Sequence, residues 1–380
     1  MAATPIYNFS AGPAILPPEV FERAAEAVRE LRADGHAPGA PGIGLSLLEI
    51  SHRSKPFAAV HEAAIALSHE VLGIPDTHEV LLLQGGASLQ FAMVPLNFAT
   101  PGAKLCYADT GAWSSKAIKE SREIAAGGRG HETVVVSSAK QSGYDHIPAL
   151  PALPADATYL HLTSNNTIYG TEYATMPEVD VPLVVDASSD IGSRPMGLER
   201  AAIGYAGAQK NLGPSGVTLV WIDRSWLERE VPAGVPNILR YKTHADAGGL
   251  FNTPNTFGVL VLELVLEWVK AHGGVEAMAA RNMAKADALY AALDGSSLYV
   301  PHARADSRSR MNVTWTLGGA PEAEREALTK RFLSEAAAAG LDGLKGHRSV
   351  GGCRASIYNA FPVEGVTKLV DFMAEFERKA

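Results

Sequence analysis

The sequence predicts an α/β fold with a large domain and a smaller one, and three features lead to this prediction. Through the first two thirds of the chain, short apolar runs that suit buried strands alternate with longer amphipathic stretches that suit helices. From residue 273 onward the pattern changes to a few strands among several helices, as in a small α+β domain. The 380 residues also exceed the length that a single core usually supports.

The large domain is expected to begin with an amphipathic helix after Pro17 and Pro18, because proline suits the first turn of a helix. The apolar residues and glycines of segment 42–57 predict a covered loop, and a helix over 55–72 follows. The predicted strands lie at 79–84, 103–109, 131–137, 159–163, 182–186, 203–210 and 216–223. The sequence leaves open whether the last of these runs parallel or antiparallel to its neighbours.

The helix predicted over 257–272 is apolar on most of its circumference and ends at Gly273-Gly274, so we expect it to connect the two domains. Beyond it, helices are predicted at 274–293, 321–340 and 363–379, with a strand at 310–317. The expected division is an N-terminal segment (1–15), a large domain (16–256), the connecting helix (257–272) and a small domain (273–380).

Asp186 and Lys210 each stand at the end of an apolar run, so both would face one crevice at the edge of an open α/β sheet. This pair suits pyridoxal phosphate, which bonds covalently to a lysine and needs an acid to keep its pyridinium nitrogen protonated. An Asp and a Lys taken alone are more often an ordinary ion pair or two solvated loop ends. The flanking residues favour a ligand site, because they offer hydrogen-bonding groups and glycines that let the backbone approach a ligand. They are Ser188, Ser189, Gln209, Gly207 and Gly213.

Two segments of this region, VDASSDIGSRP (185–195) and YAGAQKNLGPSG (205–216), closely resemble the lysine region of phosphoserine aminotransferases, which are class V aminotransferases with fold type I. The resemblance covers most of the chain, through NFSAGP, ISHRSK, LQGGAS, TSNNTIYGT, FNTPNTF and GHRSVGGCRASIYNA. It implies a mostly parallel seven-stranded sheet between helices in the large domain, a small C-terminal α+β domain, and bound pyridoxal phosphate. It also implies a homodimer with shared active sites and an N-terminal segment at the active site.

The resemblance assigns cofactor contacts to residues that have ordinary structural interpretations by themselves. A strand that runs into Gly85-Gly86 and a helix exposes N–H groups that suit a phosphate, but glycine pairs are common. A tryptophan at a helix start is more often a core residue, and clusters of Asn and Thr are usually turns. By resemblance, Ala87 and Ser88 bind the cofactor phosphate, and Trp113 stacks on the cofactor ring. Thr163 and Gln209 also contact the cofactor, and Asp186 and Lys210 are the catalytic residues. Asn252 and Thr253 reach the cofactor phosphate of the neighbouring subunit.

Six residues are assigned to the substrate in the same way. Alone, they would be a turn serine, a surface His-Arg pair and a solvated basic loop. Arginine suits a carboxylate, and clustered Arg and His suit a phosphate dianion. The resemblance places Ser10 at the amino-acid substrate and Arg354 at its α-carboxylate, and places His52, Arg53, His347 and Arg348 at its phosphate. The implied reaction transfers an amino group between glutamate and 3-phosphohydroxypyruvate, as in serine biosynthesis; the sequence leaves open whether phosphohydroxythreonine of pyridoxine biosynthesis is also a substrate.

The sequence departs from the family pattern at two positions, and other functions stay open. Asn255 stands where many relatives have proline, which alters loop stiffness. Cys353 stands where relatives often have methionine, which raises the alternative of a cysteine desulfurase; a reactive cysteine is expected on a mobile loop, whereas Cys353 begins a strand-like run. Another class V transaminase and a non-catalytic binding protein with the same fold are further alternatives. Release of sulfide from cysteine would indicate the desulfurase, and the lack of a visible cofactor band would indicate the binding protein.

Composition excludes several classes of protein. With 47% hydrophobic and 19% charged residues the chain is globular, and a net charge of −8 disfavours nucleic acid as a partner. The two cysteines suggest a reducing compartment, and the N-terminus lacks the pattern of a secretion signal. The longest apolar stretch, 259–269, contains two glutamates and is too short for a bilayer. We therefore expect a cytoplasmic protein with neither a membrane segment nor a metal site.

Overall fold

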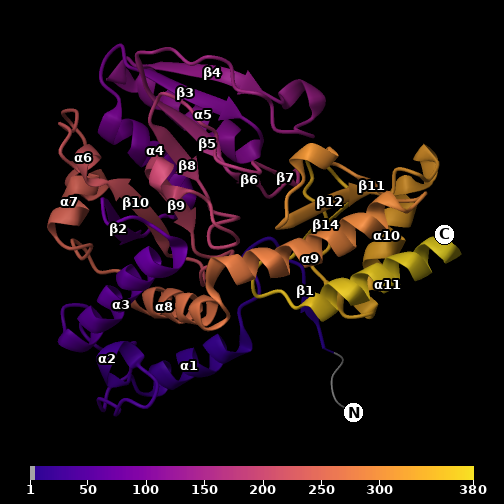
Figure 1. The fold of residues 1–380 in the computed structure, drawn as a ribbon, viewed down its shortest axis with the longest axis horizontal. Coiled ribbons are helices and arrows are strands. Elements are labelled where there is room, and N and C mark those ends of the chain that lie inside the picture. Colours follow the sequence, from indigo (N-terminus) through magenta and orange to yellow (C-terminus); the bar gives the residue numbers. More distant parts are fainter. Residues whose placement is uncertain (1–4) are drawn as a thin grey trace.

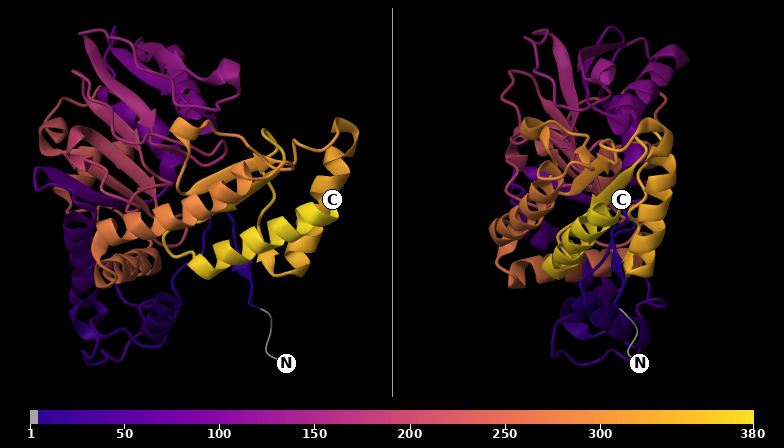
Figure 2. Two further views of the ribbon diagram at one scale, coloured as in Figure 1. Left: turned by 45° about the vertical axis from the view of Figure 1, so that its right-hand side comes forward. Right: turned by 90° about the vertical axis from the view of Figure 1, so that its right-hand side faces the viewer.

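The computed structural model describes residues 5–380. In Figure 1 a large sheet with helices on both faces forms one side of the molecule, and the C-terminal elements, orange to yellow, form the other. The left view of Figure 2 shows the same two parts after a turn of 45°. This is the α/β fold that the sequence predicts, with the smaller group of elements at the C-terminal end.

The large sheet has seven strands in the order β2-β10-β9-β8-β5-β3-β4. Only β10 is reversed, since it pairs antiparallel with both β9 and β2, while the other pairings are parallel. This confirms the mostly parallel sheet and answers the question of direction that the sequence left open. The strands are β2 (His78–Leu83), β3 (Lys104–Asp109), β4 (Glu132–Ser138), β5 (Ala157–Thr163), β8 (Leu183–Asp186), β9 (Ala201–Gly207) and β10 (Thr218–Asp223).

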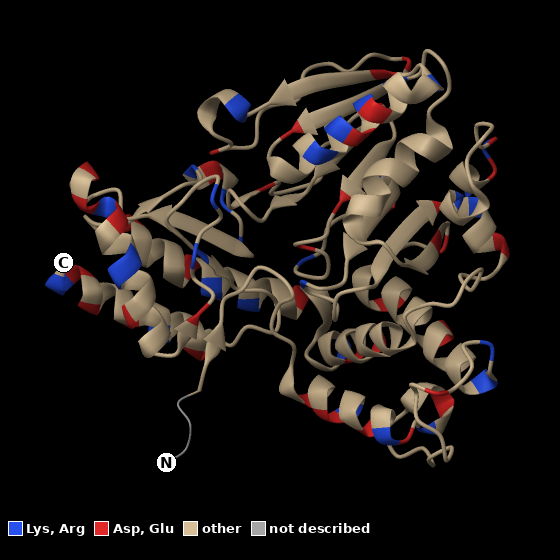
Figure 3. Cartoon of the chain, turned by 180° about the vertical axis from the view of Figure 1, so that it is seen from behind, with Lys and Arg blue, Asp and Glu red and all other residues tan. Residues whose placement is uncertain are grey.

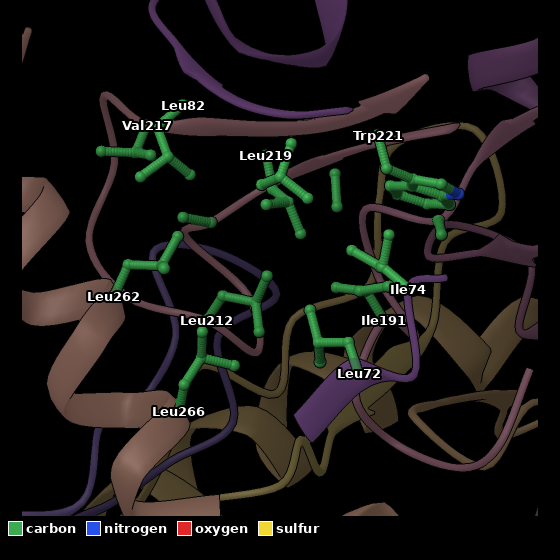
Figure 4. Packing of buried hydrophobic residues seen from close by; sticks show 14 of the residues in the cluster. Leu72, Ile74, Leu82, Ile191, Leu212, Val217, Leu219, Trp221, Leu262 and Leu266 are labelled. Carbon is green, nitrogen blue, oxygen red and sulfur yellow. The ribbon is translucent and has the colours of Figure 1, made fainter. Parts of the chain in front are cut away.

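Helices cover both faces of this sheet, which explains why its inner strands are continuous apolar runs. Alternate strand residues point into different cores: Leu82 and Val185 pack with one set of helices, and Leu81 and Val184 with the other. Figure 4 shows part of the first core, where Leu262 and Leu266 of a helix face Leu219. The first set is α1 (Pro18–Arg29), α3 (Lys55–Leu72) and α8 (Thr256–Ala271), and the second is α4 (Gly86–Phe98) and α5 (Ala112–Ile124).

The C-terminal elements have a core of their own, built around Trp315, Phe332 and Phe361. The N-terminal strand β1 (Tyr7–Asn8) pairs with β13 (Leu341–Asp342), so the chain start joins this part of the molecule. We propose that residues 273–380 form the small domain and 16–256 the large one, joined by 257–272, and the separate cores support this division. The C-terminal elements are β11 (Val300–Pro301), β12 (Asn312–Thr316) and β14 (Cys353–Ser356) in one antiparallel sheet, with α9 (Gly274–Asp294), α10 (Glu322–Ala338) and α11 (Val363–Lys379).

Short elements complete the described chain. A two-stranded hairpin, β6 (Asn165–Asn166) and β7 (Thr171–Glu172), follows β5 and becomes important at the site. The remaining helices are α2 (Ala33–His36), α6 (Arg224–Leu227) and α7 (Tyr241–Asp246), with single turns at Ala125–Arg129, Lys140–Ser142, Leu198–Arg200, Asn237–Leu239 and Ala305–Ser307.

Two details differ from the sequence prediction. The loop within 42–57 is not covered in the single chain, because Leu45 and Leu48 are 49% and 63% exposed, although Leu47 is buried. Ile43, Leu47 and Ile50 pack on the first core, whereas Leu45 and Leu48 are left exposed. The strand predicted to end at Lys210 ends at Gly207, because the Ala208 N–H bonds the Val217 carbonyl and the chain then turns.

A glycine in β9 gives a test of this packing. A Cβ added at Gly204 would lie 1.9 Å from Cζ2 of Trp221, a ring that is fully buried. We expect Gly204→Ala to destabilise the protein by about 1–3 kcal/mol through overpacking, seen as a lower midpoint of thermal unfolding. Gly127→Ala is the control, since that exposed position has open space around it. Equal midpoints for the two variants would contradict the packing described here.

Candidate active site

Residues from five strand ends meet in one pocket of about 140 Å³ at the carboxyl edge of the large sheet. Seven residues that the sequence analysis selected line it, and Asp186 and Lys210 are among them, as expected for one shared crevice. Four further lining residues are Gly86, Asn165, Ser188 and Ser189. The seven are Ala87, Ser88, Trp113, Thr163, Asp186, Gln209 and Lys210.

Asp186 lies at the end of β8 and is buried. Its Oδ1 accepts hydrogen bonds from the Ser188 hydroxyl at 2.6 Å and from the Ser188 N–H at 3.0 Å. Burial raises the pKa of the Asp186 carboxyl, while Ser188 and the Lys210 charge act in the opposite direction. The carboxylate is therefore held in one orientation and has a strong need for a positive partner.

Lys210 lies in the turn after β9, and its amine is placed between polar and aromatic groups. Nζ donates a hydrogen bond to Thr167 Oγ1 at 3.0 Å and lies 5.6 Å from the centre of the Trp113 ring. The pKa of the Lys210 amine is lowered to about 8, chiefly by burial; the charges of Asp186 and Asp190 raise it, and the charge of Arg354 contributes to lowering it. A substantial fraction of the amine is thus neutral near pH 8, as a nucleophile or a base requires.

The turn between β2 and α4 has the geometry of an anion site. Gly85 and Gly86 have φ values of 94° and 67°, in the left-handed region that favours glycine, and a Cβ at Gly85 would lie 2.4 Å from Leu89 Cδ2. Helix α4 begins at Gly86, so Ala87 and Ser88 occupy its first turn. The free N–H groups and the positive end of the helix dipole there suit a phosphate.

Several buried polar atoms at the pocket have no partner in the described structure. They include Thr163 Oγ1, Trp113 Nε1 and Asn165 Oδ1. Such groups are rare in folded proteins unless a ligand or water satisfies them. Together with the buried carboxylate, the amine and the helix N-terminus, they fit pyridoxal phosphate, which presents a ring nitrogen, an aldehyde, a hydroxyl and a phosphate. The residues present therefore fit the cofactor that Asp186 and Lys210 indicate.

Of the six residues predicted to bind the substrate, Arg354 is held beside this pocket by its contact with Thr167. Arg354 of β14 donates from Nη1 to the Thr167 carbonyl at 3.4 Å, and its buried Nε has no partner in residues 5–380. Gly12 of the N-terminal segment is close to the lysine, since an added Cβ there would lie 3.7 Å from Lys210 Cγ, whereas Ser10, two residues earlier, lies against Gly343. The N-terminal segment and the small domain thus both reach the lysine.

The other predicted residues do not line this pocket. His347 and Arg348 lie on the loop 346–351, where burial and then the charges of Arg354 and Arg348 lower the pKa of His347. Arg348 itself lines a second cavity, of about 630 Å³, beside α10. His52 and Arg53 precede α3, and Asn252 and Thr253 precede α8, with the Thr253 carbonyl accepting a 2.9 Å hydrogen bond from Gln84.

Sequence reasoning missed Asn165 and Thr167 as individual site residues. Both lie in the polar stretch after β5 from which only Thr163 was selected. A cluster of polar residues after a buried strand was the available signal, but the sequence does not show which of them point inward. The structure decides this, because the β6–β7 hairpin turns Thr167 toward Lys210.

Comparisons with known proteins agree with this geometry. The family model described as Aminotransferase class-V matches residues 6–369. Among curated proteins, the phosphoserine aminotransferase of Geobacillus kaustophilus is 50% identical and that of Bacillus subtilis 47% identical, with about 98% of each chain covered. The solved structure of the phosphoserine aminotransferase from Bacillus circulans subsp. alkalophilus superposes with a TM-score of 0.89 at 44% identity, covering 98% of this chain and 99% of that one. The chain belongs to the class V aminotransferase family.

Proposed function

We propose that this protein is a pyridoxal-phosphate-dependent phosphoserine aminotransferase. It would transfer an amino group reversibly between L-glutamate and 3-phosphohydroxypyruvate, giving O-phospho-L-serine and 2-oxoglutarate. The observation that carries the proposal is the meeting of Lys210 and Asp186 in one pocket with the N-terminus of α4, in a chain half identical to phosphoserine aminotransferases over nearly its full length. A phosphoserine aminotransferase structure from Trichomonas vaginalis, 34% identical, is described as bound to PLP, which supports the cofactor.

When bound, pyridoxal phosphate supplies an electron-poor ring that stabilises negative charge at the substrate Cα. Asp186 would hold a proton on the ring nitrogen, a role that suits a buried carboxylate whose negative form is favoured by a nearby positive charge. Lys210 would bind the aldehyde carbon and, once the substrate amine replaces it, move the proton at Cα. A lysine pKa of about 8 suits both tasks near neutral pH. Ala87, Ser88, Trp113, Thr163 and Gln209 would hold the phosphate and the ring.

The substrate side of the site is positively charged in a protein of net charge −8. Arg354 lies beside Lys210 and would bind the α-carboxylate that every amino-acid substrate carries. His347 and Arg348, together with His52 and Arg53, would bind the phosphate of phosphoserine or the distal carboxylate of glutamate. In Figure 3 the positions of Lys and Arg alternate with those of Asp and Glu along the visible helices.

The residues that do not line the pocket lead us to propose a homodimer with shared sites. Asn252 and Thr253 would complete the partner's phosphate site, and His52 and Arg53 would lie at the same interface. Exposed apolar side chains occur beside both pairs: Leu45 and Leu48 shortly before His52, and Phe251, 39% exposed, directly before Asn252. A dimer interface would cover them. In the described residues, no helix is both long and apolar enough to cross a membrane. We propose a cytoplasmic enzyme, because its two cysteines are both free thiols, as is usual in a reducing compartment.

The two anion sites can be separated with alanine, a substrate with no distal anion. Arg354→Ala should slow half-reactions with phosphoserine and alanine alike. Arg348→Ala should lower kcat/KM for phosphoserine by about ten- to a hundredfold, the effect of one lost charge-assisted contact, and change it little for alanine. Stopped-flow recording of the cofactor band measures both rates. If Arg348→Ala lowers kcat/KM equally for the two substrates, Arg348 does not bind the phosphate. The site would then specify only an amino-acid substrate, without a preference for phosphoserine.

Mixing two inactive variants tests the shared site. Lys210→Ala and Thr253→Asp should each be inactive, because the first removes the covalent anchor and the second places a carboxylate beside the partner's phosphate. In a hybrid dimer one site contains both lesions and the other contains neither, so refolded mixtures should regain partial activity. A fully active monomer in sedimentation, or hybrids with no activity, would contradict the shared site.

The desulfurase alternative requires a reactive cysteine, and the structure disfavours it. Cys353 is buried in β14 opposite Trp315, and burial raises the pKa of its thiol. Burial also raises the pKa of Cys106. Thiol reagents at pH 8 should therefore modify neither cysteine in the native protein, although both react after denaturation, and Cys353→Ala should retain transamination. Rapid labelling of native Cys353, or sulfide release from cysteine, would favour the alternative.

A further inference from the structure

Thr167 is in contact with both functional groups that would act on a substrate's Cα and carboxylate. Its Oγ1 accepts the hydrogen bond from Lys210 Nζ at 3.0 Å, and its carbonyl oxygen accepts the bond from Arg354 Nη1 at 3.4 Å. Thr167 is itself only 2% exposed. One buried residue thus joins the lysine of the large domain to the arginine of the small domain.

The position of Thr167 is determined by a firmly held turn. The β6–β7 hairpin on either side is closed by Asn166, whose Nδ2 donates to Thr171 Oγ1 at 3.1 Å and whose carbonyl accepts from the Gly170 N–H at 2.8 Å. Asn165 anchors the hairpin to both domains, because its Nδ2 donates to Ser189 Oγ and to Asn312 Oδ1, each at 2.8 Å. The Thr167 hydroxyl therefore sits at a fixed point relative to the pocket.

A lysine amine that has been released from the cofactor needs a fixed hydrogen-bond partner to keep it near the substrate Cα. Lysine has a flexible four-carbon stem, and its freedom of rotation reduces the time that the amine spends near Cα. The Thr167 hydroxyl offers an acceptor for that amine inside the pocket, and the Trp113 ring limits it on another side, 5.6 Å from Nζ. A hydrogen-bond acceptor favours the ammonium form of an amine, whereas burial favours the neutral form and lowers the pKa of Lys210.

We infer that Thr167 is a positioning residue that holds the free Lys210 amine where it can transfer the proton at the substrate Cα. The Thr167 carbonyl holds the Arg354 guanidinium at a fixed position relative to the same amine. A substrate whose carboxylate binds Arg354 would therefore have its Cα close to the Lys210 amine. This inference presumes the proposed function, in which Lys210 is released from the cofactor by the incoming amine.

Two substitutions at Thr167 separate the effect of its hydroxyl from the effect of its side-chain shape. Thr167→Val keeps the branched shape and removes the acceptor, whereas Thr167→Ser keeps the acceptor and loses a methyl group. In the holoenzyme we expect Thr167→Val to lower kcat for the half-reaction by about ten- to a hundredfold with both phosphoserine and alanine, with KM little changed. Phosphoserine deuterated at Cα should show a larger isotope effect in this variant, because proton transfer becomes more rate-limiting. Thr167→Ser should stay within about threefold of the unmodified enzyme.

Unchanged proton transfer in Thr167→Val would overturn the inference. So would an equal loss in Thr167→Ser, because the methyl group and not the hydroxyl would then matter. A rise in KM without a change in kcat would also overturn it, since it would assign Thr167 to substrate binding.

A second measurement does not depend on the substrate. The cofactor-free, full-length chain is labelled competitively with acetic anhydride at a series of pH values. Mass spectrometry of the Lys210 peptide then gives the fraction of the Lys210 amine that is neutral at each pH. Without the acceptor the ammonium form is less stable, so Thr167→Val should lower the pKa of Lys210 and raise its labelling at pH 7 by about three- to tenfold. Thr167→Ser should not, and Lys270, which pairs with Glu70 on the surface, serves as the internal control.

The two measurements have separate meanings. An unchanged Lys210 profile in Thr167→Val would show that the hydroxyl does not hold the amine, whatever the substrate is. A shifted profile in a protein that does not react with phosphoserine would instead count against the proposed substrate and leave the contact between Thr167 and Lys210 in place.

Discussion

The parallel direction of the strands is the constraint on which this site depends. Because β2, β3, β5, β8 and β9 all run the same way, their carboxyl ends meet at one edge of the sheet and each delivers residues to the same small volume. Only β10 is reversed, and it contributes no residue to the pocket lining. A carboxylate, an amine, an aromatic ring and a helix N-terminus therefore come together although they are widely separated in the sequence.

Buried charges beneath the pocket show how this edge is held. Arg194 donates to Glu172 at 3.0 Å and lies 3.4 Å from Asp190, and all three side chains are almost fully buried. Burial raises the pKa of Asp190 to about 7, against the effect of the Arg194 charge, and Asp190 also accepts a hydrogen bond from Ser164. Paired buried charges are costly to separate, so this cluster locks the β6–β7 hairpin to the segment after β8. Because Thr167 lies in this hairpin, the same cluster also fixes the position of Thr167 relative to Lys210.

The two domains contribute different chemistry to the site. The large domain lines the pocket with a carboxylate, a lysine and the N-terminus of α4, and the C-terminal part places Arg354 beside it, while the basic loop 346–351 lies outside the pocket lining. The chain as a whole is acidic, with a net charge of −8, so the positive charge of Arg354 and of this loop is a local feature. Arg348 of this loop lines the separate cavity beside α10.

The sequence by itself determined the fold class, the mostly parallel sheet by resemblance, and the position of most helices, because apolar periodicity and proline and glycine signals are local. The α3 and α11 helices begin and end where the pattern predicted. It also selected Asp186 and Lys210, since each ends an apolar run that is typical of a buried strand. Only the tertiary structure decided the reversal of β10, the exposure of Leu45 and Leu48, and the inward direction of Asn165 and Thr167. Those properties depend on which neighbours a side chain meets across the sheet or hairpin, and such contacts between distant residues leave no periodic signal in the chain.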